Sequence, residues 1–443
     1  MKILILRHLI HLYLLDLIPS KIRKILIVSK LNKHLKWVVK EIPFYEKLKF
    51  NKISLESFPI INKSIWIDHY NELNNLNLHY KDLYAEAKKQ EISRDFNGLY
   101  RGYTIGLSSG TSGKPGIILV SKNERAIWVA TVLKNIIGLK FKKRKVAFFL
   151  RSNSTLYESV KSKLLEFSYF DLSLPLEQLK LQLLECKPDI IVAPSTVLNK
   201  ILENHDSVSL NNLEQIIAVA EVFDDLTKNT LKNQFPQVQL SEVYQATEGL
   251  LAYTCRLGNM HFNSNQIHAE FEDLPLANDR ETLPKDVLRK QLIITDFTRK
   301  AQPLIRYRMG DIVQIRINIC PCGNTNTWIH KIEGRQEDCL QFNNRVGNLI
   351  YLFPDSVRQW IIQSSQNVID FYVTQLDNKT VQIQLNIMES EFEMVKQFIQ
   401  HKFDDFNLVN GLESITLIFE NSEIYHPLNS KNSRVINKTR NGI

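Results

Sequence analysis

A cluster of glycines, hydroxyl side chains and one lysine fills residues 106–116, and its composition suggests a chemistry. The seven central residues are Ser108, Ser109, Gly110, Thr111, Ser112, Gly113 and Lys114. Exposed backbone N–H groups, hydroxyl donors and a cation are the groups that a polyphosphate needs. The stretch therefore predicts a phosphate-binding loop, and the alternative is a flexible surface turn.

The residues around this cluster decide which kind of phosphate loop it could be. Short apolar stretches at 103–105 and 117–120 predict two strands. A P-loop needs a Ser or Thr after its lysine and a helix directly behind it, whereas Pro115 follows Lys114. A Walker-type NTPase is therefore disfavoured, and we expect a tight turn between two strands.

Behind this loop, residues 145–235 alternate apolar stretches with amphipathic ones. Strands are expected at 146–150, 189–194 and 215–220, and helices at 176–184 and 196–204. Continuous apolar strands separated by helices favour a parallel α/β sheet, in which ligands bind at the carboxyl ends of the strands. Glu221 comes directly after one of these strands and is therefore a candidate for contact with a ligand.

Tyr244, Thr247 and Glu248 fall within one short segment that follows a β-like stretch at 238–240. A tyrosine ring can stack on a purine, and a nearby carboxylate can bind Mg²⁺. The alternative is that these residues only shape a turn.

Two later segments place charged residues beside glycines. Asp311 is expected at the end of an arginine-rich strand within residues 303–311, where its carboxylate could accept both hydroxyls of a ribose or pair with an arginine. Arg335 and Glu337 follow Gly334, at the point where the character of the chain changes. A glycine followed by charged residues is also typical of an ordinary linker.

The cysteines carry a separate signal. There are five, at 186, 255, 320, 322 and 339. An odd number without a secretory signal makes a disulfide framework unlikely, and the cytoplasm is the expected compartment. Cys255 and His261, with Cys320 and Cys322, offer three thiolates and one imidazole, a closed tetrahedral set for a structural Zn²⁺. The alternative is a group of buried thiols and a surface histidine.

Positive charge is concentrated at the start of the chain. The 443 residues carry a net charge of +9. Before Pro43 only Asp16 and Glu41 oppose the basic residues, which are Lys2, Arg7, Lys21, Arg23, Lys24, Lys30, Lys33, Lys36 and Lys40. With Leu and Ile interleaved at helical spacing, residues 1–40 predict a basic amphipathic segment on an anionic membrane or a helix pair packed on the body of the protein.

Other targets of a basic protein are disfavoured. Arg7, His8 and Asp16 interrupt the first apolar run, which is unlike a signal peptide, and no later stretch is long and apolar enough to span a bilayer. No pattern of a nucleic-acid-binding module is present, so we expect no nucleic-acid partner.

The chain divides into three expected parts. Residues 1–40 form the basic segment, 41–335 a large domain and 336–443 a small one. We predict an α/β fold whose large domain has parallel-rich sheets flanked by helices plus a barrel-like subdomain. The small, mobile domain is expected to be α+β, with a strand at 380–385 and helices at 355–364 and 389–402.

Taken together, the motifs resemble a known family. The phosphate loop, Tyr-x-x-Thr-Glu, Arg-Tyr-Arg-x-Gly-Asp and Gly-Arg-x-x-Asp patterns occur in the order seen in the adenylate-forming superfamily of acyl-CoA ligases, luciferases and peptide-synthetase adenylation domains. More narrowly, the chain is similar to the phenylacetate–CoA ligase and coenzyme F synthetase branch. The signs of that branch are Pro43-Phe44-Tyr45, Ala220-Glu221 and Cys320-Pro321-Cys322-Gly323. The resemblance covers roughly residues 40–440.

The resemblance implies roles for the candidate residues in binding ATP. Residues 108–114 would hold the β- and γ-phosphates. Glu221 and Tyr244 would border the adenine, Thr247 would contact the α-phosphate and Glu248 would bind Mg²⁺.

It also implies a two-step reaction with a domain rotation. Asp311 and Arg335 would bind the ribose, and Glu337 would be the hinge. Lys431 matches the catalytic lysine of the family's late Gly-Lys-x-x-Arg motif. The departures are Gln245 and Ser430, which replace glycines, and a glutamate at 337 in place of the more usual aspartate.

The expected activity is that of an ATP- and Mg²⁺-dependent carboxylic acid ligase. It would form an acyl- or aryl-adenylate and pass the acyl group to a thiol, with coenzyme A as the expected acceptor. One alternative is transfer to the thiol of a carrier protein. Another is a zinc-stabilised protein that binds a nucleotide or an acyl ligand without turnover.

Overall fold

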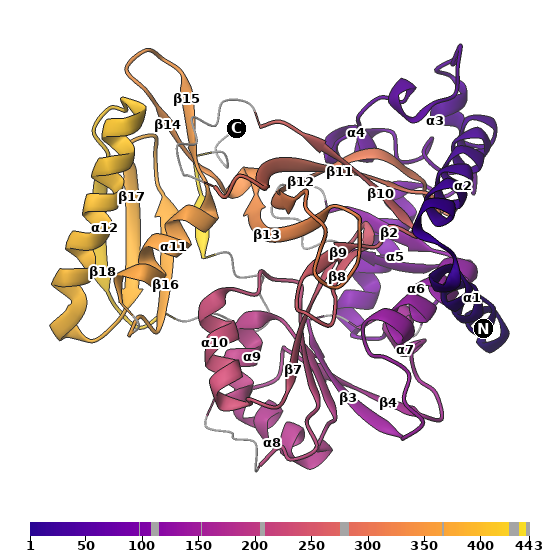
Figure 1. Ribbon diagram of the computed structural model, residues 1–443, viewed down its shortest axis with the longest axis horizontal. Helices are drawn as coiled ribbons and strands as arrows, with labels where there is room; N and C mark the ends of the chain where they lie inside the picture. The colour runs from indigo at the N-terminus through magenta and orange to yellow at the C-terminus, as the bar shows by residue number, and fades with distance from the viewer. Residues whose placement is uncertain are drawn as a thin grey trace. The chain divides into compact units, whose positions relative to one another are not determined.

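The computed structural model describes residues 1–96, 98–107, 115–151, 153–203, 209–274, 283–365, 367–424 and 434–439 (Figure 1). The chain divides into two compact units. The first unit comprises Met1–Phe271, Ile293–Met309 and Ile317–Ile329, and the second comprises Glu272–Leu292, Gly310–Arg316 and His330–Ile443. The predicted boundary between residues 335 and 336 stays a prediction. Residues 108–114 and Lys431 lie outside the described residues.

A short hairpin flanks the predicted phosphate loop. Strands β1 (Thr104–Leu107) and β2 (Ile117–Val120) pair antiparallel, with Leu107 opposite Ile117. Helix α6 (Lys122–Asn135) begins only after β2, at a capping box between Ser121 and Glu124. The glycine-rich segment therefore joins two strands, as predicted, and this is not the strand–loop–helix arrangement of a P-loop.

A parallel sheet forms the centre of the first unit. Its strands are β3 (Arg144–Leu150), β4 (Leu165–Asp171), β5 (Ile190–Ala193), β6 (Gln215–Val219) and β7 (Gln239–Ala246), in the order β7-β6-β5-β3-β4. All neighbours in this order are parallel. Helices α7 (Thr155–Glu158), α8 (Leu176–Cys186), α9 (Ser195–Leu202) and α10 (Asp225–Gln234) connect them. All four residues of β5 are buried, which explains the continuous apolar run in the sequence.

The same sheet continues with further strands. These are β8 (Gly249–Thr254), β9 (Met260–Phe262), β10 (Ile267–Glu272), β11 (Val287–Asp296), β12 (Leu304–Arg316) and β13 (Trp328–Arg335). The pairs β7–β8, β8–β9 and β9–β13 are antiparallel. The full order is β10-β11-β12-β13-β9-β8-β7-β6-β5-β3-β4. Strands β8 to β13 thus extend the main sheet. Strands β11, β12 and β13 each contribute residues to both units.

One local prediction was wrong. Asp311 does not end its strand but lies inside β12, which runs on to Arg316. Arg306 and Gly310 adopt positive φ angles of 47° and 77°, so the backbone bends on either side of Arg308 instead of stopping. The sequence Arg-Tyr-Arg-x-Gly-Asp therefore marks an irregular strand and not a strand terminus.

The second unit contains the predicted small α+β sheet. Strands β16 (Asp370–Gln375), β17 (Thr380–Asn386), β18 (Thr416–Asn421) and β19 (Val435–Asn437) have the order β18-β17-β16-β19. Helices α11 (Pro354–Ser364) and α12 (Glu389–Asn410) and the hairpin β14 (Leu340–Asn343)–β15 (Leu349–Leu352) complete it. Helix α12 runs past the predicted end at 402 because Phe403 continues its buried stripe and Gly411 ends it in the left-handed region.

Helices dominate the first hundred residues. They are α1 (Lys2–Leu17), α2 (Ser20–Glu41), α3 (Pro43–Glu46), η1 (Leu55–Ser57), α4 (Lys63–Asp68) and α5 (Tyr80–Ser93). Helix α1 packs on α6, where the Lys134 ammonium lies 2.6 Å from the Asp16 carboxylate and donates to the carbonyl of Leu12. None of the described helices is long and apolar enough to cross a membrane.

A buried histidine makes the seating of α2 sensitive to pH. Burial, aided by Lys300 and Lys30, lowers the pKa of His34 to about 3, and its Nε2 has no partner among the described residues. Unfolding restores the ordinary His34 pKa of about 6.5. Between this value and about 3, His34 is therefore protonated in the unfolded chain but neutral in the folded one. Stability from this histidine is therefore present above pH 6.5 and is lost as the pH falls toward 3.

We expect the free energy of unfolding to fall by about 2 kcal/mol more in the wild type than in His34→Gln when the pH drops from about 7 to about 5. Urea denaturation at both pH values measures this difference. The exposed His401 provides the control, because His401→Gln should follow the wild type. Equal pH dependence in the wild type and His34→Gln would contradict the assignment.

Candidate active site

Thr247 and Glu248 form the turn between β7 and β8 in the first unit. Arg299, only 6% exposed, donates from Nη1 to the carbonyl of Glu248 and from Nη2 to the carbonyl of Leu119, at 3.2 Å. Leu119 belongs to β2, the strand that follows the predicted phosphate loop. The Arg299 guanidinium thus links the Thr247-Glu248 turn to the hairpin of β1 and β2.

Glu124 holds the segment that carries this arginine. Its Oε1 accepts from the backbone N–H groups of Lys300 and Ala301, while Oε2 accepts from the N–H of Ser121. The capping carboxylate of α6 therefore also orders residues 299–301. Sequence reasoning missed Arg299, because no local motif marks a residue whose partners lie 51 and 180 positions away.

A small hollow lies beside the Thr-Glu turn. Thr247, Glu248 and Arg299 line it together with Gly116 and Ile117, which follow the predicted phosphate loop in the sequence. The remaining wall is mostly apolar or aromatic and consists of Trp66, Ile118, Gln302, Leu304 and Tyr307. The Tyr80 hydroxyl donates to the carbonyl of Pro115 at 2.8 Å, which anchors the end of the loop to α5. The hollow thus offers a polar end beside the turn and an apolar wall.

Glu221 and Tyr244 lie near the same edge of the parallel sheet. Val219, the last residue of β6, is opposite Val243 of β7, so Glu221 follows the end of β6 while Tyr244 lies near the end of β7, close to the carboxyl ends of both strands. Ala220, which lies between Val219 and Glu221, has φ 67°. The Glu221 N–H donates to the Val219 carbonyl at 2.8 Å, so these three residues form a strained tight turn. Strain at a strand end where ligands bind is consistent with a functional position.

The Glu221 carboxylate has a definite partner. Its Oε2 accepts from the N–H and the hydroxyl of Thr196, at 3.1 and 2.8 Å. These donors lie in the first turn of α9, where a carboxylate is favoured by the helix dipole. The contact orients the glutamate at the sheet edge.

The second unit brings together the other predicted nucleotide residues. Arg335 Nε lies 3.9 Å from a carboxylate oxygen of Asp311, and its Nη1 donates to Glu337 at 2.9 Å. Glu337 sits in the short helix η2 (Gln336–Asp338), directly after β13. These contacts are as compatible with an ion-pair network as with a ribose site. The ribose roles of Asp311 and Arg335 and the hinge role of Glu337 therefore stay predictions.

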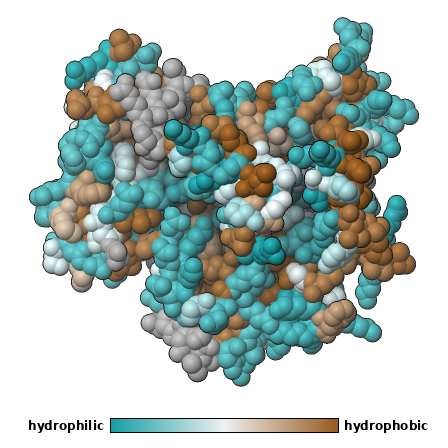
Figure 2. Space-filling view, viewed as in Figure 1, coloured by the Kyte–Doolittle hydropathy of each residue, from teal (hydrophilic) through white to brown (hydrophobic). Residues whose placement is uncertain are grey.

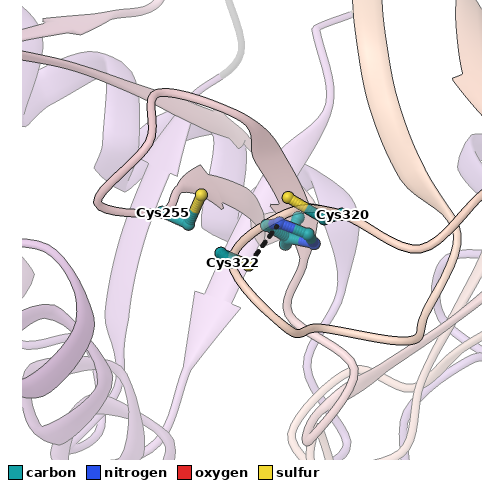
Figure 3. A group of neighbouring side chains, drawn as sticks. Cys255, Cys320 and Cys322 are labelled. Carbon is teal, nitrogen blue, oxygen red and sulfur yellow. Dashed lines mark hydrogen bonds between the residues drawn. The ribbon is translucent and has the colours of Figure 1, made fainter.

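Cys255, His261, Cys320 and Cys322 form one cluster in the first unit (Figure 3). Their ligand atoms all lie within 4.8 Å of one another. Zn–S bonds of about 2.3 Å place tetrahedral ligands about 3.8 Å apart, so small shifts would close the set around Zn²⁺. Burial lowers the pKa of His261, which favours the neutral imidazole that a metal requires.

Two matching turns present the thiolates. Cys255-x-x-Gly258-Asn259 and Cys320-x-x-Gly323-Asn324 each bond the glycine N–H to the cysteine carbonyl at 2.9 Å. In each turn the cysteine N–H also bonds the asparagine carbonyl, and both glycines have positive φ. This repeated geometry builds a rigid cradle for the sulfurs and fits the residues to a structural metal.

Comparison with known proteins finds a CoA ligase of similar sequence and CoA ligases of similar fold. No family model matches the chain. It is 20% identical over 348 residues to the phenylacetate-coenzyme A ligase of Thermus thermophilus, which covers 74% of this chain and 73% of the relative. The chain has the fold of the adenylate-forming ligases.

Solved structures support this statement. A 2-hydroxyisobutyryl-CoA ligase in the postadenylation state, in complex with 2-HIB-AMP, matches with a TM-score of 0.68 at 16% identity, over 96% of this chain and 91% of the other. ATP-bound MatB from Rhodopseudomonas palustris matches with a TM-score of 0.51 at 13% identity, over 76% of this chain and 66% of the other.

Gln245, noted above as a departure from the pattern of the resembled family, contacts two aromatic side chains. Its Oε1 accepts from Trp128 Nε1 at 3.1 Å, and its Nε2 faces the Tyr157 hydroxyl at 3.4 Å. Burial raises the pKa of Tyr157 to about 12, so its hydroxyl stays protonated. The departure from the family pattern is thus a polar link between β7 and two aromatic side chains.

Arg299→Lys should weaken both the fold and the site. A lysine cannot serve two carbonyls in the guanidinium's fork geometry, and an unpaired buried carbonyl costs about 1–3 kcal/mol in unfolding free energy. Chemical denaturation measures the loss, and the exposed Arg345→Lys should show none. Unchanged stability in Arg299→Lys would contradict the bridging role.

The cysteine cluster predicts about one zinc per chain, measured by elemental analysis of protein purified with the metal present. Cys322→Ser should lose the metal and melt several degrees lower, because an incomplete set leaves buried ligands unpaired. Cys186→Ser is the matched control, since this cysteine lies outside the cluster. Metal-free wild type, or an equal zinc content in Cys322→Ser, would rule out this site.

Proposed function

We propose that the protein is an ATP- and Mg²⁺-dependent carboxylic acid ligase that works through an acyl- or aryl-adenylate. The observation that carries the proposal is the hollow lined both by Thr247 and Glu248 and by Gly116 and Ile117, which follow the glycine-rich loop, in a chain with an adenylate-forming fold. Two solved structures of similar fold, a 2-hydroxyisobutyryl-CoA ligase with 2-HIB-AMP and an anthranilate CoA ligase with anthranoyl-AMP, are consistent with this chemistry.

The first unit would hold the triphosphate and the acid. Residues 108–114 would bind the β- and γ-phosphates, Thr247 the α-phosphate, and Glu221 and Tyr244 the adenine. Mg²⁺, when bound at Glu248, would neutralise phosphate charge. The acid would then lie with its carboxylate at the polar end of the hollow and attack the α-phosphorus, displacing pyrophosphate.

Further roles in the proposal fall to residues of the second unit. Asp311 and Arg335 would hold the ribose, and Lys431 would offset charge on the phosphate oxygens during adenylation. Rotation about Glu337, at the proposed boundary between 41–335 and 336–443, would then withdraw the lysine and admit a thiol. Thiol attack on the acyl carbon releases AMP.

The acceptor in this proposal is coenzyme A. A relative's solved structure contains both an acyl-adenylate and CoA. A carrier-protein thiol is the alternative acceptor, and a structural Zn²⁺, a cytoplasmic location and contact with a membrane surface remain parts of the proposal. Supplying each thiol separately to enzyme loaded with the adenylate distinguishes the two acceptors.

Carboxylate-dependent pyrophosphate release, screened over aryl, short-chain and long-chain acids, tests the first step. Lys431→Ala should lower adenylate formation by about 10²–10³-fold, as expected for a lost electrostatic contact to a developing charge. Lys438→Ala, at a nearby lysine without an assigned role, should retain wild-type rates. ATP binding by both variants, measured by calorimetry, should match the wild type.

A different result would favour the non-catalytic alternative. ATP binding without pyrophosphate release for any acid, unchanged by Lys431→Ala, would mean that the protein binds a nucleotide without turning it over.

A further inference from the structure

The first two helices expose an apolar surface that takes no part in the adenylation or thiol-transfer steps proposed above. Helix α1 seats Leu12 and Leu15 against the body of the first unit. On its other side, six apolar side chains are between 44% and 84% exposed: Ile3, Leu6, Ile10, Tyr13, Leu14 and Leu17. At about 100° per residue they fall within an arc of about 100°, which is one continuous stripe.

Basic residues flank this stripe. On the same helical projection, the exposed Lys2 and Arg7 lie on its two sides. The single carboxylate of α1, Asp16, is paired with Lys134 and lies 3.6 Å from Arg23 of α2. The stripe is therefore apolar at its centre and positive at its margins.

Helix α2 repeats the pattern along its length. Its buried residues, Leu31, His34, Leu35 and Val38, face the body. The opposite side carries exposed Ile22, Ile25 and Leu26 in its first half. At the same helical spacing that side continues with exposed Lys33, Lys36 and Lys40. The outer face of α2 thus changes from apolar to cationic.

The two helices lie at the right-hand edge of Figure 1, and Figure 2 shows hydrophobic side chains gathered along the same edge. A surface of this kind is unusual, because soluble monomers rarely expose contiguous apolar patches. It calls for an occupant that accepts apolar side chains and supplies negative charge.

We propose that the outer faces of α1 and α2 dock on an anionic lipid surface, with the apolar stripe below the headgroups and the basic residues against them. A helix that lies in the interface shows this distribution of apolar centre and lysine margins. A second copy of the chain is disfavoured as the occupant, because a two-fold interface would bring this lysine-rich face against itself. The docking needs no ligase activity and is tested without it.

Co-sedimentation of the full chain with lipid vesicles tests the proposal. The protein should bind phosphatidylserine-containing vesicles, bind neutral phosphatidylcholine vesicles more weakly, and lose binding as salt rises. Ile10→Ser with Leu14→Ser should lower binding more than about tenfold, as should Lys33→Gln with Lys36→Gln. Leu181→Ser with Leu408→Ser changes two leucines of similar exposure elsewhere and should bind as the wild type does.

Three results would overturn the proposal. They are an absence of vesicle binding, equal binding by the wild type and the Ile10/Leu14 variant, and a concentration-dependent dimer that the same variant dissociates. Light scattering in lipid-free buffer reports the last of these. Far-UV circular dichroism and thermal unfolding of each variant verify that lost binding does not reflect lost folding.

Discussion

The candidate active site depends on one buried cation. Arg299 is held between two backbone carbonyls, one in the Thr-Glu turn and one in the strand that leaves the glycine-rich loop. Without it, two motifs more than a hundred residues apart in the sequence would have no fixed relation. A guanidinium suits this task because its donors form a rigid fork and its charge persists when it is desolvated.

The parallel sheet supplies the second constraint on the site. Parallel neighbours bring their carboxyl ends to one edge, where Glu221 follows β6 and Tyr244 lies near the end of β7. The strained backbone at Ala220 turns Glu221 toward the start of α9, where two donors of Thr196 hold it. The local strain is tolerated because buried strands on both sides fix the turn.

The cysteine cluster of the first unit lies in a different set of residues from the Thr247-Glu248 turn. The cysteine cluster lies on loops next to β9 and β13, and its two matching turns explain why each cysteine segment carries a Gly-Asn pair. A metal there would tie the 255–261 segment to the 320–324 segment. Such a tie would stabilise the antiparallel pairing of β9 with β13.

The sequence alone determined three of the parallel strands (β3, β5 and β6), the strand–turn–strand setting of the glycine loop and the four members of the cysteine cluster. These follow from local features, namely apolar runs, a proline after the lysine and the ligand types present. Only the tertiary structure revealed Arg299, the position of Asp311 inside β12 and the outward stripe of α1. Those depend on distant partners, and an apolar helix such as α1 does not specify by itself which side its neighbours will cover.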